Sequence, residues 1–205
     1  MRNIITKNPI IAILRNVPSD ILIPYVSAVL DGGIKTLEIA MNTQNGAQQI
    51  YTIKKHFGDK IIIGAGTAIT KERIDTALEA GAEFFLTPSV REDILQYFNQ
   101  LGLPVLPGIM TPSDVDLCLK YGFDTFKLFP AGDLPMSYIK SLKGPFDTTE
   151  YVAVGGVTLE NLSDFMNEGY IGVGIASNLI PKDYIQTRSW KEATDYVRKY
   201  VEQCK

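Results

Sequence analysis

The sequence predicts a single (β/α)8 barrel over residues 1–205. The first observation is a repeated unit, in which an amphipathic helical segment ends at a glycine and an apolar segment follows within a few residues. The second is that residues able to cap a helix follow several of these apolar segments. Such alternation indicates parallel strands joined by right-handed crossovers, and eight repeats favour a closed barrel.

The expected elements follow from these signals in chain order. Apolar runs rich in β-branched and aromatic residues predict strands at 10–14, 36–40, 61–65, 84–87, 104–107, 125–129, 151–154 and 171–175. Helical segments are expected near 21–31, 46–57, 71–80, 91–101, 112–121, 135–142, 159–167 and 189–203. No linker or low-complexity tract interrupts them, so one domain is expected.

Glycines mark the helix ends and polar residues mark the helix starts. Glycine takes the left-handed conformation with the least steric cost, and one is found just after several helical segments: Gly33, Gly81, Gly102, Gly122 and Gly169. Helix starts are predicted at Thr70, at Ser89 with a glutamate three residues on, and at Thr111 with a proline next and an aspartate three residues on.

An open doubly wound sheet is the alternative arrangement of these elements. Such sheets usually have fewer strands and often carry a glycine fingerprint for dinucleotides. The run Gly64-Ala65-Gly66 begins like that fingerprint but lacks the third glycine. The number of elements therefore favours the barrel.

Composition and charge narrow the classes of partner. A net charge of -3 provides no broad basic field, so neither nucleic acid nor an anionic membrane is expected as a main partner. The N-terminal residues lack the apolar core of a signal peptide, and no later run reaches membrane-spanning length. These features predict a cytoplasmic protein, and an anionic small molecule stays open as a ligand because it needs only a local site.

The cysteines and the histidine exclude several kinds of site. Cys118 and Cys204 are the only cysteines and lie far apart in sequence, so they suggest neither a disulfide framework nor a cysteine metal site. The single histidine, His56, follows two lysines and is expected on a solvated helix face. Histidine triads and histidine-rich zinc sites are thereby excluded, whereas a magnesium site made of carboxylates stays open.

Lys127 is the most unusual residue, because it stands inside an apolar strand that ends at Pro130. Burying an ammonium group is costly, so the group would lose its proton more easily and become a nucleophile near neutral pH. A desolvated lysine of this kind can attack a ketone and form a Schiff base. The alternative is a structural lysine that forms a salt bridge or extends to solvent at the strand end.

Glu38 is the second unusual residue, a carboxylate between Leu37 and Ile39. Alternate residues of a barrel strand face outward, so outward Leu37 and Ile39 would direct Glu38 into the barrel. An inward acid can neutralise Lys127, transfer protons, or do both. A buried ion pair without chemistry is the alternative.

Further polar residues and glycines are expected at the carboxyl ends of the strands, where barrel enzymes place their active sites. Glycines after the last two strands would let backbone N–H groups reach a phosphate, unless they only make tight turns. Arg15 would face a carboxylate or phosphate, although a surface arginine is as compatible with the sequence. The remaining candidate ligand-binding residues are Asn42, Thr67, Pro88, Phe129, Gly155, Gly156 and Ser177.

The chain resembles the aldolases of 2-keto-3-deoxy-6-phosphogluconate (KDPG) and 4-hydroxy-2-oxoglutarate (KHG). The resemblance extends over almost the whole chain and depends on blocks that occur in order: 11–15 (IAILR), 33–39 (GIKTLEI), 63–67 (IGAGT), 87–88 (TP), 107–112 (PGIMTP), 126–131 (FKLFPA), 155–157 (GGV) and 174–177 (GIAS). Each block is modestly specific, and together they are strong.

The resemblance implies a homotrimeric class I aldolase that needs no metal or other cofactor. Lys127 corresponds to the Schiff-base lysine and Glu38 to its general acid and base. Thr67, Pro88 and Phe129 correspond to the pyruvate pocket. Gly155, Gly156 and Ser177 correspond to the phosphate site.

Two positions depart from the pattern of many members of the family. Asn42 replaces an arginine that contacts the substrate carboxylate, so Arg15 is expected to supply that charge. Val154 replaces a threonine before the paired glycines of gluconate-type members. Both departures resemble the branch that acts on the C4 epimer, 2-keto-3-deoxy-6-phosphogalactonate.

The predicted reaction cleaves 2-keto-3-deoxy-6-phosphogluconate to pyruvate and glyceraldehyde 3-phosphate, and extends to 4-hydroxy-2-oxoglutarate, which yields glyoxylate. The same chemistry on the galactonate epimer is the first alternative. A phosphosugar isomerase or epimerase that uses Glu38 as its base is a second, and a sugar-phosphate binding protein without catalysis is a third.

Overall fold

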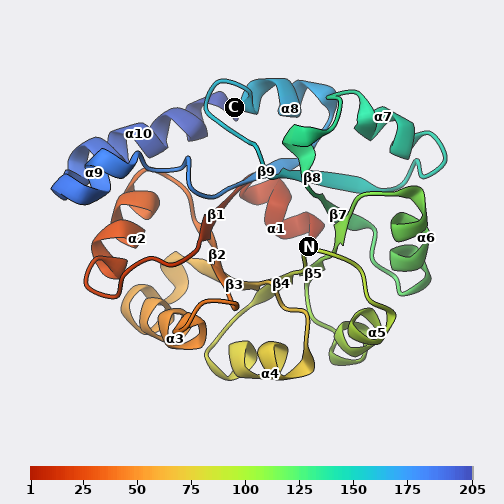
Figure 1. Ribbon diagram of the computed structural model, residues 1–205, viewed down its shortest axis with the longest axis horizontal. Helices are drawn as coiled ribbons and strands as arrows, with labels where there is room; N and C mark the ends of the chain where they lie inside the picture. Colours follow the sequence, from red (N-terminus) through yellow and green to blue (C-terminus); the bar gives the residue numbers. More distant parts are fainter. Residues whose placement is uncertain (205) are drawn as a thin grey trace.

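The computed structural model describes residues 1–204 and shows a ring of parallel strands surrounded by helices (Figure 1). The strands pair in the order β5-β4-β3-β2-β1-β9-β8-β7-β6. Their bounds are β1 (Ile10–Leu14), β2 (Thr36–Ala40), β3 (Ile62–Gly66), β4 (Phe84–Leu86), β5 (Val105–Leu106), β6 (Gly108–Ile109), β7 (Thr125–Leu128), β8 (Glu150–Val154) and β9 (Gly172–Ile175). The predicted (β/α)8 barrel is confirmed.

One strand of the barrel is divided at Pro107. Its first part, β5, pairs with β4, and its second part, β6, pairs with β7, so the divided strand closes the ring. Proline has no N–H to donate to a neighbouring strand, which accounts for the break. The Pro107 carbonyl still accepts a 2.8 Å hydrogen bond from the Lys127 backbone N–H.

The helices agree with the expected segments and add two. The helices are α1 (Arg2–Lys7), α2 (Leu22–Asp31), α3 (Gly46–Phe57), α4 (Lys71–Glu79), α5 (Glu92–Leu101), α6 (Pro112–Lys120), α7 (Tyr138–Lys143), α8 (Leu162–Glu168), α9 (Lys182–Thr187) and α10 (Trp190–Gln203), with short 3-10 turns at η1 (Gly58–Lys60) and η2 (Ala131–Asp133). Helices α1 and α9 were not predicted. Each has only six residues, too few for a clear amphipathic period.

The predicted helix ends are confirmed, and two of the three predicted starts are confirmed. The five predicted glycines adopt positive φ between +64° and +106°. The Thr70 side chain caps α4, and Thr111 forms a full capping box with Asp114 at α6. The predicted cap at Ser89 is wrong, because α5 starts only after Arg91 and has no side-chain cap.

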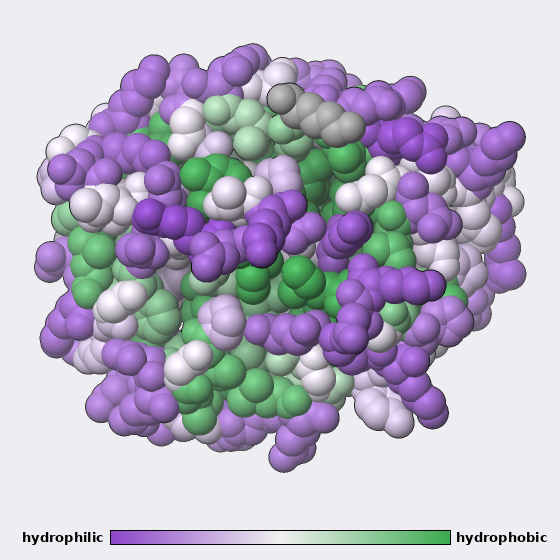
Figure 2. All heavy atoms as spheres, turned by 180° about the vertical axis from the view of Figure 1, so that it is seen from behind, coloured by the Kyte–Doolittle hydropathy of each residue, from purple (hydrophilic) through white to green (hydrophobic). Residues whose placement is uncertain are grey.

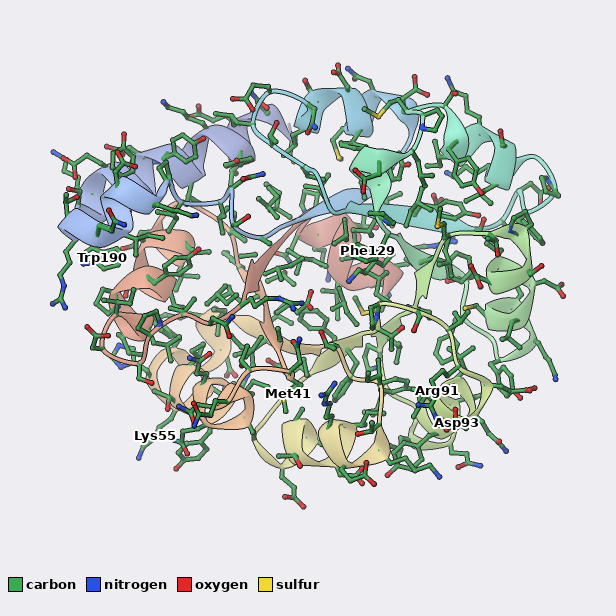
Figure 3. The ribbon with its side chains drawn as sticks, in the orientation of Figure 1. Met41, Lys55, Arg91, Asp93, Phe129 and Trp190 are labelled. Carbon is green, nitrogen blue, oxygen red and sulfur yellow. The ribbon has the colours of Figure 1, made fainter. Side chains whose placement is uncertain are left out.

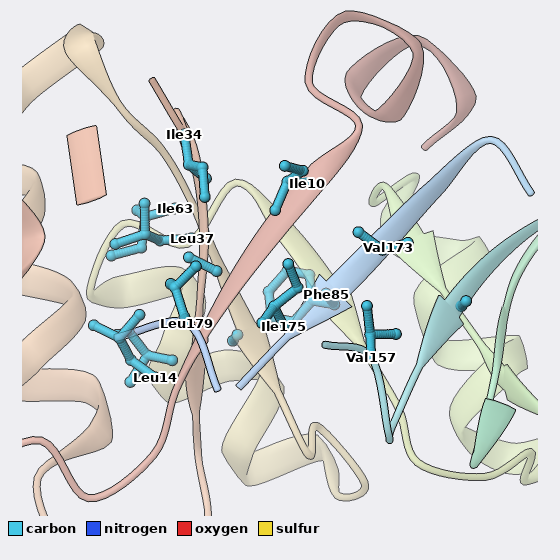
Figure 4. Close-up of a cluster of buried hydrophobic side chains, with 14 of the residues drawn as sticks. Ile10, Leu14, Ile34, Leu37, Ile63, Phe85, Val157, Val173, Ile175 and Leu179 are labelled. Atoms are coloured by element: carbon cyan, nitrogen blue, oxygen red, sulfur yellow. The ribbon is translucent and has the colours of Figure 1, made fainter. Parts of the chain in front are cut away.

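Two apolar clusters lie on opposite faces of the strands. Outward-facing residues such as Leu37 and Ile39 pack against the helices, and Figure 4 shows part of this outer cluster. The cluster that packs within the ring comprises Ile5, Ile11, Ile13, Phe84, Leu86, Leu106, Val152 and Val154. The alternation along each strand therefore separates an outer core from the barrel interior.

Helix α1 closes the amino-terminal end of the barrel. Its Ile5 is fully buried in the inner cluster, with Met1 and Ile4 packed beside it. The open end of the barrel is therefore the carboxyl end of the strands.

Seen from the side opposite to Figure 1, the surface is largely hydrophilic with apolar patches near its middle (Figure 2). In residues 1–204, none of the helices combines the length and apolar character needed to cross a bilayer.

Candidate active site

Nine of the ten predicted site residues line one cavity of about 170 Å³ at the carboxyl ends of the strands. These residues are Arg15, Glu38, Thr67, Pro88, Lys127, Phe129, Gly155, Gly156 and Ser177. Asn42 is the exception: it is exposed, lies two residues beyond β2, and does not belong to the cavity lining. The structure thus collects residues from seven strands or strand ends.

Lys127 enters the cavity from β7. Its neighbours Phe126 and Leu128 face the outer core, so the alternation of the strand directs Lys127 inward. The residue is 7% exposed, and its burial lowers the pKa of the ammonium group. The Lys127 Nζ lies 4.9 Å from the ring centre of Phe129, which is found near the middle of the barrel in Figure 3.

Glu38 enters the same cavity from β2 and is 2% exposed. Burial raises the pKa of its carboxyl group, while the positive charges of Lys127 and Arg15 oppose that increase. Its Oε2 has no hydrogen-bond partner in residues 1–204. A side chain on Gly66 would overlap the Glu38 carboxylate, so this glycine creates the room that the acid occupies.

No hydrogen bond or ion pair joins Glu38 to Lys127 in the described part of the chain, although each shifts the pKa of the other. The charge of Glu38 raises the pKa of Lys127, whereas burial and Arg15 lower it. The net effect is a lowered pKa of Lys127. Because Lys127 is buried and forms no ion pair with Glu38, the alternatives of a closed structural salt bridge and of a lysine extending into solvent are both wrong. The two groups instead line one shared cavity.

Thr67 has a strained backbone that an arginine holds in place. Its φ is +54°, a left-handed value that is rare for a β-branched residue. The Thr67 carbonyl accepts hydrogen bonds from the Ile69 N–H at 3.0 Å and from Arg73 Nη1 at 3.2 Å. Sequence reasoning missed Arg73, because an arginine in the first turn of a helix carries no distinguishing signal.

Gly155 and Gly156 form a turn that packs closely on the loop after β7. Their φ values are +89° and +76°, and a side chain on Gly156 would lie 2.9 Å from the Gly132 Cα. The Gly132 N–H donates a 2.8 Å hydrogen bond to the Gly155 carbonyl. Helix α8 begins only at Leu162, so no helix N-terminus directly follows these glycines. Their tight turn is established, and a phosphate-binding role remains a prediction.

Arg15 and Ser177 lie on opposite sides of the seam between β1 and β9. Both are exposed, and both line the cavity. Asn178 also lines it, a residue that sequence reasoning missed, and its Nδ2 donates a 3.3 Å hydrogen bond to the Val157 carbonyl. This side of the cavity therefore offers a guanidinium, a hydroxyl and an amide to a polar ligand.

The other residues with unusual chemistry lie away from the cavity. His56 is on the exposed face of α3, as predicted, next to Lys55, which projects away from the barrel in Figure 3. Cys118 and Cys204 are free thiols. Within residues 1–204, no three side chains of histidine, cysteine, aspartate or glutamate gather closely enough to share a metal ion.

Curated relatives match the chain over nearly its full length. The 2-dehydro-3-deoxy-6-phosphogalactonate aldolase of Escherichia coli (strain K12) is 35% identical over 199 residues, which cover 96% of this chain and 97% of that protein. The 2-dehydro-3-deoxy-phosphogluconate aldolase of Pseudomonas aeruginosa is 31% identical over 196 residues, which cover 95% of this chain and 87% of that protein. The similarity is thus not confined to a single motif.

A solved structure and a family model agree with these relatives. The KDPG aldolase of Legionella pneumophila, with pyruvate captured as a covalent carbinolamine, is 25% identical and superimposes with a TM-score of 0.87, covering 96% of each chain. A model of the KDPG and KHG aldolase family matches residues 1–196. With its barrel fold, the chain therefore belongs to the family of KDPG and KHG aldolases and is a carbon–carbon lyase.

Proposed function

We propose that the chain cleaves 2-keto-3-deoxy-6-phospho sugar acids through a Schiff base on Lys127. The observation that carries this proposal is the pairing of a buried lysine of lowered pKa with a buried carboxyl group of raised pKa, both facing one cavity. Two titratable groups whose environments bring their pKa values toward neutrality are suited to nucleophilic and proton-transfer roles.

In the proposed mechanism, the neutral amine of Lys127 adds to the C2 ketone of the substrate. Glu38 supplies the proton with which the carbinolamine loses water, and the resulting iminium withdraws electrons from C3. Glu38 then accepts the proton of the C4 hydroxyl while the C3–C4 bond breaks and the aldehyde leaves. Protonation of the enamine at C3 and hydrolysis of the iminium release pyruvate and restore Lys127.

The lining of the cavity supports a division into two halves. Thr67, Pro88 and Phe129 lie around Lys127 and are proposed to hold the pyruvate portion. Gly155, Gly156 and Ser177 are proposed to hold the phosphate, because backbone N–H groups and a hydroxyl are usual partners of that group. Arg15 is proposed to bind the substrate carboxylate, as the sequence predicts. Asn42 is assigned to neither half, because it does not line the cavity.

We further propose that the galactonate epimer is preferred, which is the alternative in the sequence prediction. Val154 lines the cavity beside Gly155, and it replaces the threonine of gluconate-type members with an apolar side chain. The Escherichia coli galactonate aldolase is also 35% identical to this chain, against 31% for the Pseudomonas aeruginosa gluconate enzyme. The Val154→Thr variant should therefore shift relative kcat/KM toward the gluconate epimer.

The first test is borohydride reduction of the protein in the presence of pyruvate, followed by peptide mass spectrometry. A pyruvate-derived adduct is expected on Lys127 and should be absent in the Lys127→Ala variant. A folded protein that gives no adduct would refute the Schiff-base mechanism. Measured kcat/KM values for the two phosphorylated epimers and for 4-hydroxy-2-oxoglutarate then decide the substrate, and a preference for the gluconate epimer would refute the epimer proposal.

The assembly and location of the enzyme complete the proposal. A homotrimer is proposed from the sequence resemblance, and sedimentation equilibrium tests it, since a monomeric mass would refute it. A cytoplasmic location is supported by the two free thiols, which are typical of reducing compartments. Fractionation of the source cells checks this location.

A further inference from the structure

A second cavity of about 410 Å³ adjoins the catalytic cavity, which measures about 170 Å³. The two cavities share Ile13, Arg15, Ala176 and Ser177 as lining residues. These four residues come from the ends of β1 and β9, which pair in the barrel. The larger cavity therefore adjoins the catalytic cavity at Arg15 and Ser177, and Lys127 lines only the catalytic cavity.

The walls of the second cavity are mainly apolar. The residues that form them are Leu14 at the end of β1, Val17, Pro18 and Ile21 before α2, and Ile180 and Ile185 around α9. Its polar lining residues include Tyr25 and two cations, Arg15 and Lys182, and no carboxylate is among the residues that line it. Neither cation forms an ion pair within residues 1–204. Such a lining suits an apolar group that ends in an anion.

Tyr25 also lines the second cavity. The residue is 5% exposed, and its hydroxyl forms no hydrogen bond with another described residue, but that oxygen reaches solvent and is not a buried group without a partner. Burial of the ring raises the pKa of Tyr25 to about 12, which keeps the hydroxyl protonated and able to donate. The hydroxyl is therefore free to donate a hydrogen bond to a ligand oxygen in the second cavity.

We propose that the second cavity extends the aldehyde side of the active site and accepts aldehydes with an apolar body and a carboxylate at the far end. This inference rests on the proposed Schiff-base function of Lys127. An aldehyde bound there would pass Arg15 and Ser177, place its methylene groups against the apolar walls, and direct its carboxylate to Lys182 and Tyr25. A polyhydroxylated chain is unsuited to these walls, because most of its hydroxyl groups would lose their hydrogen bonds.

The additional activity is an aldol addition that uses only pyruvate and the aldehyde. The pyruvate enamine on Lys127 forms a bond from its C3 to the aldehyde carbon, and the aldehyde oxygen takes up a proton. Water then hydrolyses the iminium, which restores the lysine and releases a 4-hydroxy-2-oxo acid. No external oxidant or reductant is needed, because one C–C bond forms as the carbonyl π bond is lost.

The test compares pyruvate addition to adipic semialdehyde, succinic semialdehyde, hexanal and glyceraldehyde 3-phosphate. Adipic semialdehyde has two more methylene groups than succinic semialdehyde. Each buried methylene should raise kcat/KM about fourfold, so kcat/KM for adipic semialdehyde should be about 15-fold higher. Hexanal, which lacks the carboxylate, should react less well than adipic semialdehyde. Equal rates for the two acids, or no reaction of adipic semialdehyde, would overturn the inference.

Variants in the lining of the second cavity test whether this cavity causes the preference for adipic semialdehyde. Ile185→Trp fills the cavity, and Lys182→Ala and Tyr25→Phe remove its polar partners, while Lys191→Ala on the exposed face of α10 is the matched control. The first three should lower kcat/KM for adipic semialdehyde several-fold and leave the reaction of glyceraldehyde 3-phosphate unchanged. Equal losses for both aldehydes, or losses in the control, would also overturn the inference.

The design separates this inference from the proposed function. Glyceraldehyde 3-phosphate and the borohydride adduct test the Schiff-base mechanism without the second cavity. If both succeed and adipic semialdehyde fails, the extension is refuted and the mechanism stands. If no adduct forms on Lys127, the proposed function is refuted, and the extension with it.

Discussion

The Gly66→Ala substitution tests whether the position of Glu38 controls catalysis. The new Cβ would lie 2.8 Å from the Glu38 Cγ and would overlap the carboxylate, and its three nearest atoms all belong to Glu38. Carbon atoms in contact prefer about 3.5–4.0 Å, so the Glu38 Cγ must move by about 1 Å and the overlapped carboxylate by more than that. A displacement of about 1 Å in a catalytic group costs about 10²-fold in rate.

The upper limit of the effect is the loss of all proton transfer by Glu38. General acid–base catalysis contributes about 10²–10⁴-fold, so the Glu38→Gln variant sets that limit. Gly66→Ala should lower kcat by at least about 10²-fold and no further than Glu38→Gln. It should still form the reduced pyruvate adduct on Lys127, more slowly than the parent protein, because carbinolamine dehydration also uses Glu38.

Pyruvate release coupled to lactate dehydrogenase measures the rate, and the unfolding curve in urea checks that the variant folds. Gly144→Ala is the matched control, since its φ is -54° and its new Cβ would lie 3.6 Å from the nearest atom, an ordinary contact. A folded Gly66→Ala variant with the kcat of this control would refute the reasoning. It would show that the carboxylate does not need the space above Gly66.

Three further outcomes are expected. Because burial lowers the pKa of Lys127, its adduct formation should rise with pH to a plateau reached below the pKa of about 10.4 of an ordinary lysine. Glu38→Gln removes the anion that raises this pKa, so the midpoint should move to lower pH; an upward shift in a pH series of trapping rates would contradict this. Arg73→Met removes the hydrogen bond that holds the Thr67 carbonyl and should raise KM for the keto acid up to about tenfold, with partial recovery in Arg73→Lys. A lower melting temperature with an unchanged KM would instead assign Arg73 a purely structural role. Ile5→Ala should lower the free energy of unfolding in urea by about 2–5 kcal/mol without changing KM, because Ile5 is fully buried at the end of the barrel opposite the site. A loss of less than about 1 kcal/mol would show that α1 contributes little to closing the barrel.

The sequence determined the order of strands and helices because the signals for them are local. The glycines at the helix ends and the threonine caps of α4 and α6 act within a few residues, and the structure confirms them. The burial of Lys127 and the inward orientation of Glu38 could also be predicted, because each is a charged residue within an apolar strand. The family blocks added the correspondence of these residues to a known chemistry.

Only the tertiary structure decided which residues from distant segments meet. The seam between β1 and β9 brings Arg15 to Ser177 and creates the second cavity, and the fold brings Arg73 to the Thr67 carbonyl. It also leaves Asn42 outside the catalytic cavity and closes the amino-terminal end with α1. These features depend on how the ring closes and on the space left between packed side chains, and neither is encoded in the local period of the chain.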